Sequence, residues 1–166
     1  MDNLLIRKIT AEEVPTAMAL AQEVFLQFEA PDYTPEGVES FMRDIIKNET
    51  YLENARNGVC PIYAAFDGNE MVGIMGMRAS KAHINLAFTK ASHHRRGIAT
   101  AIFRYLLDDV LRQNPNLKAI TLNSSPYGLP FYLHIGFEPL TEEQVVDGIG
   151  FTPMRYDIRK NEVSRP

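Results

Sequence analysis

Two arginines and a glycine stand where a strand-like run of residues gives way to a helix-like one. The strand-like run covers 84–89, the helix-like run covers 98–111, and the loop between them reads His93-His94-Arg95-Arg96-Gly97. The first N–H groups of a helix have no partner inside the helix, and the helix dipole makes that end positive. Glycine lets the backbone approach a ligand that a Cβ would block. The arrangement therefore predicts a site for a phosphate group.

The two common nucleotide-binding motifs do not describe this loop. A Walker A loop needs Lys-Ser/Thr at the start of the helix, and a dinucleotide fingerprint needs three spaced glycines after an early strand. This loop has one glycine and lies in the middle of the chain. Taken alone, it also fits a solvated basic turn that caps a helix.

The first part of the chain predicts one strand and two helices ahead of the loop. Leu4, Ile6 and Ile9 suit a strand, and residues 10–13 read as a capping box that opens a helix running to Phe28. Residues 29–34 are predicted to be a loop. Thr34-Pro35-Glu36 then starts a second helix, which continues to about Ile46.

The remaining segments predict a mixed α/β domain. Residues 60–66 and 71–77 form a hairpin around residues 67–70, and the run at 84–89 is a further strand. After the long helix come a strand at 119–123, a short helix at 126–134 closed by Gly136, and a late strand at 151–159. The predicted order is β-α-α-β-β-β-α-β-α-β-β, in a single domain spanning residues 1–166.

Composition and charge exclude several classes of partner. With 166 residues and a net charge of −4, the chain lacks the basic surface of a nucleic-acid-binding protein. No apolar stretch reaches the roughly 20 residues that span a bilayer, and the N-terminus has no signal-peptide pattern. We expect a cytoplasmic protein that binds neither nucleic acid nor membrane.

The single cysteine, Cys60, suits a core position, and no cluster of residues has metal-ligand spacing.

The segment 122–138 resembles the late signature of the GNAT superfamily of N-acetyltransferases. There, a strand that ends in Asn123 leads to a short helix bearing Phe131-Tyr132 and then to Gly136-Phe137. The basic loop is similar to that family's acetyl-CoA loop, Gln/Arg-x-x-Gly-x-Gly/Ala, with His94 at the first position. The resemblance implies a GNAT-like mixed central sheet flanked by helices.

The resemblance also implies acetyl-CoA (coenzyme A) as the cofactor and assigns residues to it. Backbone pairing with the pantetheine arm falls to Leu86, Ala87 and Phe88, and Asn123 matches a family asparagine that hydrogen-bonds the same arm. Tyr132 matches the family's general acid, and a phenol with a pKa near 10 suits protonation of a thiolate. The pyrophosphate would be cradled, mostly through the main chain, by Arg95, Arg96, Gly97, Ile98, Ala99 and Thr100.

The base and the acceptor site are less defined. Residues 79–90 contain no Asp or Glu, so His83 is the candidate base on the strand before the loop, although a surface or capping histidine fits it too. Phe28, Glu29, Asp32 and Tyr33 are candidates for acceptor recognition. Glu29 and Asp32 could attract a cationic amine, or they could belong to a solvated loop.

The predicted activity is acetyl transfer from acetyl-CoA to a primary amine by direct attack in a ternary complex. No cysteine suits a covalent route. The acceptor is either a small-molecule amine or a protein amine, and from the resemblance we expect a homodimer. The alternatives are a non-catalytic module that binds or senses CoA and a purely structural interaction domain.

Overall fold

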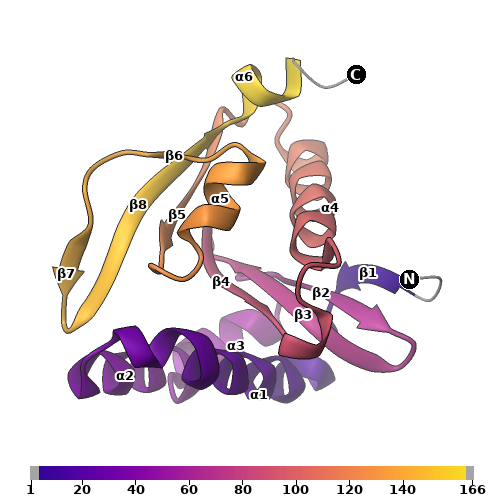
Figure 1. The fold of residues 1–166 in the computed structure, drawn as a ribbon. Coiled ribbons are helices and arrows are strands. Elements are labelled where there is room, and N and C mark those ends of the chain that lie inside the picture. The colour runs from indigo at the N-terminus through magenta and orange to yellow at the C-terminus, as the bar shows by residue number, and fades with distance from the viewer. Residues whose placement is uncertain (1–3, 164–166) are drawn as a thin grey trace.

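The computed structural model describes residues 4–163, and these form an eight-stranded mixed sheet with helices on both faces (Figure 1). The strand order is β1-β2-β3-β4-β5-β8-β6, with β7 paired to β8 off this path. The strands are β1 (Leu4–Lys8), β2 (Ile62–Asp67), β3 (Glu70–Met77), β4 (His83–Thr89), β5 (Ala119–Ser124), β6 (Glu138–Pro139), β7 (Gln144–Val146) and β8 (Ile149–Asp157). The helical elements are η1 (Ala11–Glu13), α1 (Val14–Val24), η2 (Phe25–Glu29), η3 (Ala30–Asp32), α2 (Pro35–Phe41), η4 (Met42–Ile46), α3 (Glu49–Arg56), η5 (Ala91–His93), α4 (Ile98–Gln113), α5 (Leu129–Ile135) and α6 (Ile158–Val163). The predicted fold class is confirmed.

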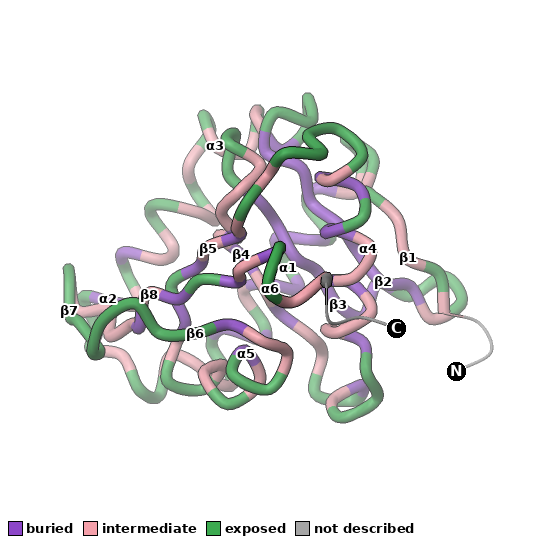
Figure 2. Tube along the Cα trace, turned by 90° about the horizontal axis from the view of Figure 1, so that it is seen from above, coloured by how far each residue is buried: buried purple, intermediate pink, exposed green. Residues whose placement is uncertain are grey.

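The core has two parts, one on each face of the sheet. Helices α4 and α5 pack on one face around Phe103 and Phe137, whereas α1 and α3 pack on the other around Phe25 and Ile62. Figure 2 shows the buried residues gathered along β2, β3 and β4, while β6 and β7 are exposed. Because both faces of the central strands are covered, β2 and β3 read as nearly continuous apolar runs.

Strands β4 and β5 diverge soon after they meet. They are parallel neighbours at only two register positions, His83 with Thr121 and Ile84 with Leu122. Beyond these positions β4 stays paired with β3 as far as Thr89, and β5 stays paired with β8 as far as Ser124. Among the described strands, none pairs with the β5-facing edge of β4 over residues 85–89. This fork leaves backbone groups of β4 available to another partner.

The predicted starts of the first two helices are confirmed, but the short helix begins at Leu129 rather than at residue 126, and the predicted loop at 29–34 is helical as far as Asp32. Thr10 N donates to Glu13 Oε1 at 2.8 Å, and Gly37 N donates to Thr34 Oγ1 at 3.2 Å. Between these two caps the chain remains helical through a π-turn (η2) and a 3₁₀ turn (η3). Pro31 is tolerated because it occupies the first turn of η3, where its missing N–H is not needed.

Two helices and one hairpin were not predicted. Helix α3 begins after Asn48, whose side chain accepts from Tyr51 N at 3.0 Å. The late strand ends at Asp157 rather than at residue 159, because the Asp157 carboxylate accepts from Lys160 N at 3.0 Å and starts α6. Strands β7 and β8 are joined by Asp147-Gly148, both at positive φ, which is the signature of a type I′ hairpin turn.

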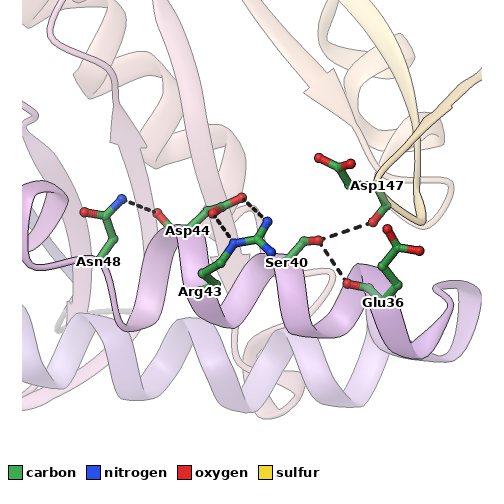
Figure 3. Close-up of polar contacts among 6 residues, drawn as sticks. All are labelled: Glu36, Ser40, Arg43, Asp44, Asn48 and Asp147. Carbon is green, nitrogen blue, oxygen red and sulfur yellow. Dashed lines mark hydrogen bonds and ion pairs between the residues drawn. The ribbon is translucent and has the colours of Figure 1, made fainter.

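The β7–β8 turn rests on helix α2 (Figure 3). The Ser40 hydroxyl lies 3.3 Å from the Asp147 carbonyl oxygen and 2.9 Å from that of Glu36. A Cβ at Gly37 would fall 2.3 Å from the Gly148 carbonyl oxygen, so only glycine permits this approach. The contact joins segments more than 100 residues apart in the sequence.

Candidate active site

A cavity of about 580 Å³ lies between β4, the loop before α4, and α5. Its walls also include the end of α1 and η2, which pack on the opposite face of the sheet. The structure therefore brings together segments from four regions of the sequence. The predicted site residues that line this cavity are Phe28, Glu29, Ala87, Phe88, Arg95, Gly97, Ile98, Ala99, Thr100 and Tyr132.

The loop that enters α4 has the backbone geometry of an anion site. Gly97 precedes the helix with φ +75°, and Arg95 also has positive φ, at +61°. The first backbone hydrogen bond of the helix runs from Ala101 N to Gly97 O at 3.0 Å. The N–H groups of residues 98–100 are thus left for a ligand, at the positive end of a 16-residue helix. A Cβ built at Gly97 has no heavy atom within 4 Å, so the space before the loop is open.

Two histidines hold this loop in place. His93 is buried, with Nε2 2.9 Å from Asp67 Oδ2 and Nδ1 2.7 Å from Ser92 Oγ. His94 Nε2 donates to the Thr89 carbonyl oxygen at 2.7 Å, which ties the loop to the end of β4. His94, which stands where the loop pattern has Gln or Arg, therefore anchors the loop to β4.

Tyr132 is buried at the inner wall of the cavity, on α5. Its ring meets Phe131 and Phe137 edge-on, with centroids 5.3 and 5.6 Å away. A Cβ at Gly128 would lie 3.0 Å from the Tyr132 ring, so that glycine lets the ring take its position. Burial, and then the negative charge of Glu29, raise the pKa of the Tyr132 phenol. The phenol accordingly keeps its proton at neutral pH.

Glu29 brings a carboxyl group into an aromatic part of the same cavity. The neighbouring Phe28 ring lies 4.8 Å from the His94 ring and stacks on Tyr127 at 5.1 Å, centroid to centroid. Burial raises the pKa of Glu29 to about 7, although a hydrogen bond from Ser125 partly opposes this by stabilising the charged form. A carboxyl group that titrates near neutral pH can exchange protons with a ligand.

Other predicted site residues lie elsewhere. His83 and Asn123 line a separate cavity of about 330 Å³, together with Tyr51 and Asn85. His83 Nδ1 is 2.8 Å from Thr121 Oγ1, and burial, followed by the charge of Arg78, lowers its pKa to about 4.

The last four predicted residues fall outside the larger cavity. Leu86 packs in the core beside α1, while Arg96 and Asp32 are exposed. Tyr33 is half-buried, with its ring edge-on to Phe25 at 5.3 Å. None of the four lines the larger cavity. The role expected of Leu86 uses its backbone, which the structure pairs with Gly76 of β3.

Sequence reasoning gave no role to Ser125 or Tyr127, which approach the cavity from the turn after β5. Tyr127 lines it, with its hydroxyl 3.4 Å from His94 Nδ1. Ser125 Oγ accepts from Gly128 N at 3.0 Å and so shapes that turn. Ser125-Pro126 directly after β5 signals a turn, but the contacts of Ser125 with Glu29 and of Tyr127 with His94 depend on the tertiary fold.

Neither a metal site nor a membrane span is found in residues 4–163. No group of three or more His, Cys, Asp or Glu side chains in this part of the chain could hold a metal ion. No helix described there is long and apolar enough to cross a bilayer.

Comparisons with known proteins agree on the fold. The sequence matches the family model of the acetyltransferase (GNAT) domain over residues 29–158, and a search of curated proteins gives no match. Among solved structures, a GCN5-related N-acetyltransferase from Rhodopseudomonas palustris has a TM-score of 0.77 at 18% identity, covering 95% of this chain and 97% of that chain. The PaiA N-acetyltransferase of Thermoplasma acidophilum, solved in complex with coenzyme A, has a TM-score of 0.69 at 18% identity, with 93% and 98% covered. A spermidine N-acetyltransferase SpeG chimera from Vibrio cholerae and hSSAT has a TM-score of 0.65 at 14% identity, with 98% and 99% covered.

Proposed function

Because the chain belongs to the acetyltransferase (GNAT) family, whose cofactor is acetyl-CoA, we propose that it transfers an acetyl group from acetyl-CoA to a primary amine. The amine attacks directly while both molecules are bound. The amine class is supported by the similarity to a spermidine N-acetyltransferase, and the acceptor itself is a small molecule or a protein amine.

One observation carries this proposal: a single cavity joins the loop before α4, the unpaired edge of β4 and the Tyr132 side chain. The loop fits a pyrophosphate because the α4 N-terminus supplies N–H donors. The space beside Gly97 is open, and any side chain at this position would occupy part of it. The free edge of β4 fits an extended arm with amide groups, which would pair with it as an added strand does.

Each part of the cavity then has a task. Residues 98–100 hold the pyrophosphate through their N–H groups, and Arg95 adds positive charge at the entrance. Residues 86–88 align the pantetheine arm through their backbone. When bound, acetyl-CoA supplies an activated acetyl thioester. The Tyr132 hydroxyl gives its proton to the departing sulfur, which makes the leaving group a neutral thiol.

The test combines binding with turnover. Acetyl-CoA at millimolar concentration should raise the melting temperature, and CoA should be released in the presence of at least one amine of a panel of polyamines, amino acids and peptides. Tyr132→Phe should keep the stabilisation and lose on the order of 10²-fold in kcat. Tyr105→Phe, a half-buried tyrosine on α4 outside the cavity, is the matched control.

The outcomes separate the competing functions. Stabilisation by acetyl-CoA without turnover of any amine would favour a CoA-binding or sensing module. No stabilisation by acetyl-CoA would rule out both the acetyltransferase and the CoA-binding module. Turnover that Tyr132→Phe leaves unchanged would show that another group protonates the sulfur.

A further inference from the structure

We propose that Glu29 is the base that removes the proton from the acceptor amine, an inference that rests on the proposed function. Among the described residues that line the larger cavity, Glu29 is the one acid. Its carboxyl group lies near enough to Tyr132 to raise the pKa of that phenol by its charge. The proton acceptor and the proton donor thus belong to the same cavity, on opposite sides of the fork between β4 and β5.

The π-turn at the end of α1 is what directs Glu29 into the cavity. Val24 and Phe28 line the same wall, four residues apart, as expected for one face of a helix. In a regular α-helix of about 3.6 residues per turn, position 29 would point about 140° away from position 24. Here Ala30 N donates to Phe25 O, five residues back, and this wider turn brings Glu29 round toward the Val24 face.

The histidines are weaker candidates for this task. In His93 and His94, both ring nitrogens already have partners in the protein. His134 lines the cavity but is exposed to water. His83 faces the separate cavity and, with its pKa lowered to about 4, holds a proton poorly at neutral pH. We therefore assign the base to Glu29 rather than to His83.

The chemistry needs such a group. An alkylammonium with a pKa near 10.4 is neutral in only roughly one molecule of 2500 at pH 7. A base works best when its pKa is near the working pH, and burial places Glu29 there, at about 7. The surrounding groups that bear on its titration are Tyr132, Tyr33 and Ser125, with His94, Tyr127 and Arg95 on the facing walls of the cavity.

Acetyl transfer redistributes the three protons of the ammonium group. The ammonium nitrogen gives one proton to a Glu29 carboxylate oxygen, and its freed electron pair forms the C–N bond while the C–S bond breaks. Tyr132 Oη gives its proton to the sulfur, and a second proton from the nitrogen replaces it. The third stays in the amide. Glu29 releases its proton to water, so one proton is set free per turnover.

The experiment compares wild type with Glu29→Gln, Glu29→Asp and the control Glu23→Gln, which is exposed on α1. The acceptors are one amine that the wild type acetylates and its less basic fluorinated analogue. For the basic amine at pH 7, Glu29→Gln should lose on the order of 10²-fold in kcat/KM, and its rate should rise about tenfold per pH unit as the free amine increases. For the fluorinated amine, the loss should be much smaller. Glu29→Asp should recover part of the activity and keep a wild-type pH profile.

Two further readouts do not depend on turnover. Acetyl-CoA should stabilise Glu29→Gln as it does wild type, and the Glu29 carboxyl, assigned by ¹³C NMR against the variant, should titrate near neutral pH. An equal loss with both amines, or a normal pH profile in Glu29→Gln, would overturn the assignment to Glu29 alone. If wild type acetylates no amine, the proposed function itself fails.

Discussion

Replacing Glu29 with glutamine should stabilise the folded protein more as the pH rises. The pKa of Glu29 is about 7 in the folded state, against 4.5 for the unperturbed group. Between these two values the folded state keeps a proton that the unfolded chain has already lost. The stability of wild type therefore falls as the pH rises from 4.5 through 7, whereas glutamine has no such proton.

The size of the effect follows from the shift. A tenfold change in an equilibrium constant corresponds to about 1.4 kcal/mol, so a rise of the Glu29 pKa from 4.5 to about 7 is worth about 3 kcal/mol. Most of this, about 2–3 kcal/mol, develops between pH 5 and pH 8. For a chain of this size, the melting temperature of Glu29→Gln relative to that of wild type should be about 5–10 °C higher at pH 8 than at pH 5.

The assay is denaturant unfolding of wild type and Glu29→Gln at pH 5, 6, 7 and 8 without acetyl-CoA. The difference in unfolding free energy between the two proteins removes the contribution of the other titrating groups. Glu23→Gln, exposed on the same helix, should keep the pH dependence of wild type. If the difference in unfolding free energy between Glu29→Gln and wild type stays constant from pH 5 to pH 8, burial does not raise the pKa of the Glu29 carboxyl group.

Three further substitutions test contacts elsewhere in the fold. Gly37→Ala should lower the melting temperature by about 4–10 °C, since its Cβ would fall 2.3 Å from the Gly148 carbonyl oxygen. Gly68→Ala is the control, because Gly68 has a φ of +62° but open space around its Cβ position, and a thermal melt should show a smaller cost of about 1 kcal/mol. Equal losses in the two variants would contradict the role of the contact between Gly37 and Gly148. Tyr63→Phe removes a buried hydrogen bond of 2.6 Å to Asp109 and should cost about 1–3 kcal/mol in denaturant unfolding, where an unchanged midpoint would show that the carboxylate finds another partner.

Several features could be predicted because their causes are local. The caps at Thr10 and Thr34 satisfy orphan N–H groups within three residues, and the hairpin around Gly68 depends on a two-residue turn. The same reasoning would have found the β7–β8 hairpin, since Asp147-Gly148 is a strong type I′ signal. The helix at Glu49–Arg56 was missed although Asn48 provides an ordinary cap.

The roles of Glu29 and His83 could not be read from the sequence. Both are polar residues beside apolar runs, and nothing in their neighbours along the chain distinguishes them. Glu29 was expected in a loop, but a π-turn carries it into the cavity, where burial raises its pKa. His83 was a candidate base on the strand before the loop, but it faces a different cavity. Homodimer formation stays a prediction.

By itself, the sequence determined the loop before α4, the glycine that opens it and the tyrosine on the following short helix. These depend on helix ends, on positive φ and on spacing along the chain, all of which act over a few residues. Only the tertiary structure decided which carboxyl group meets that tyrosine. Desolvation depends on which segments pack together across the fork of β4 and β5, and residues 29 and 132 are about a hundred positions apart.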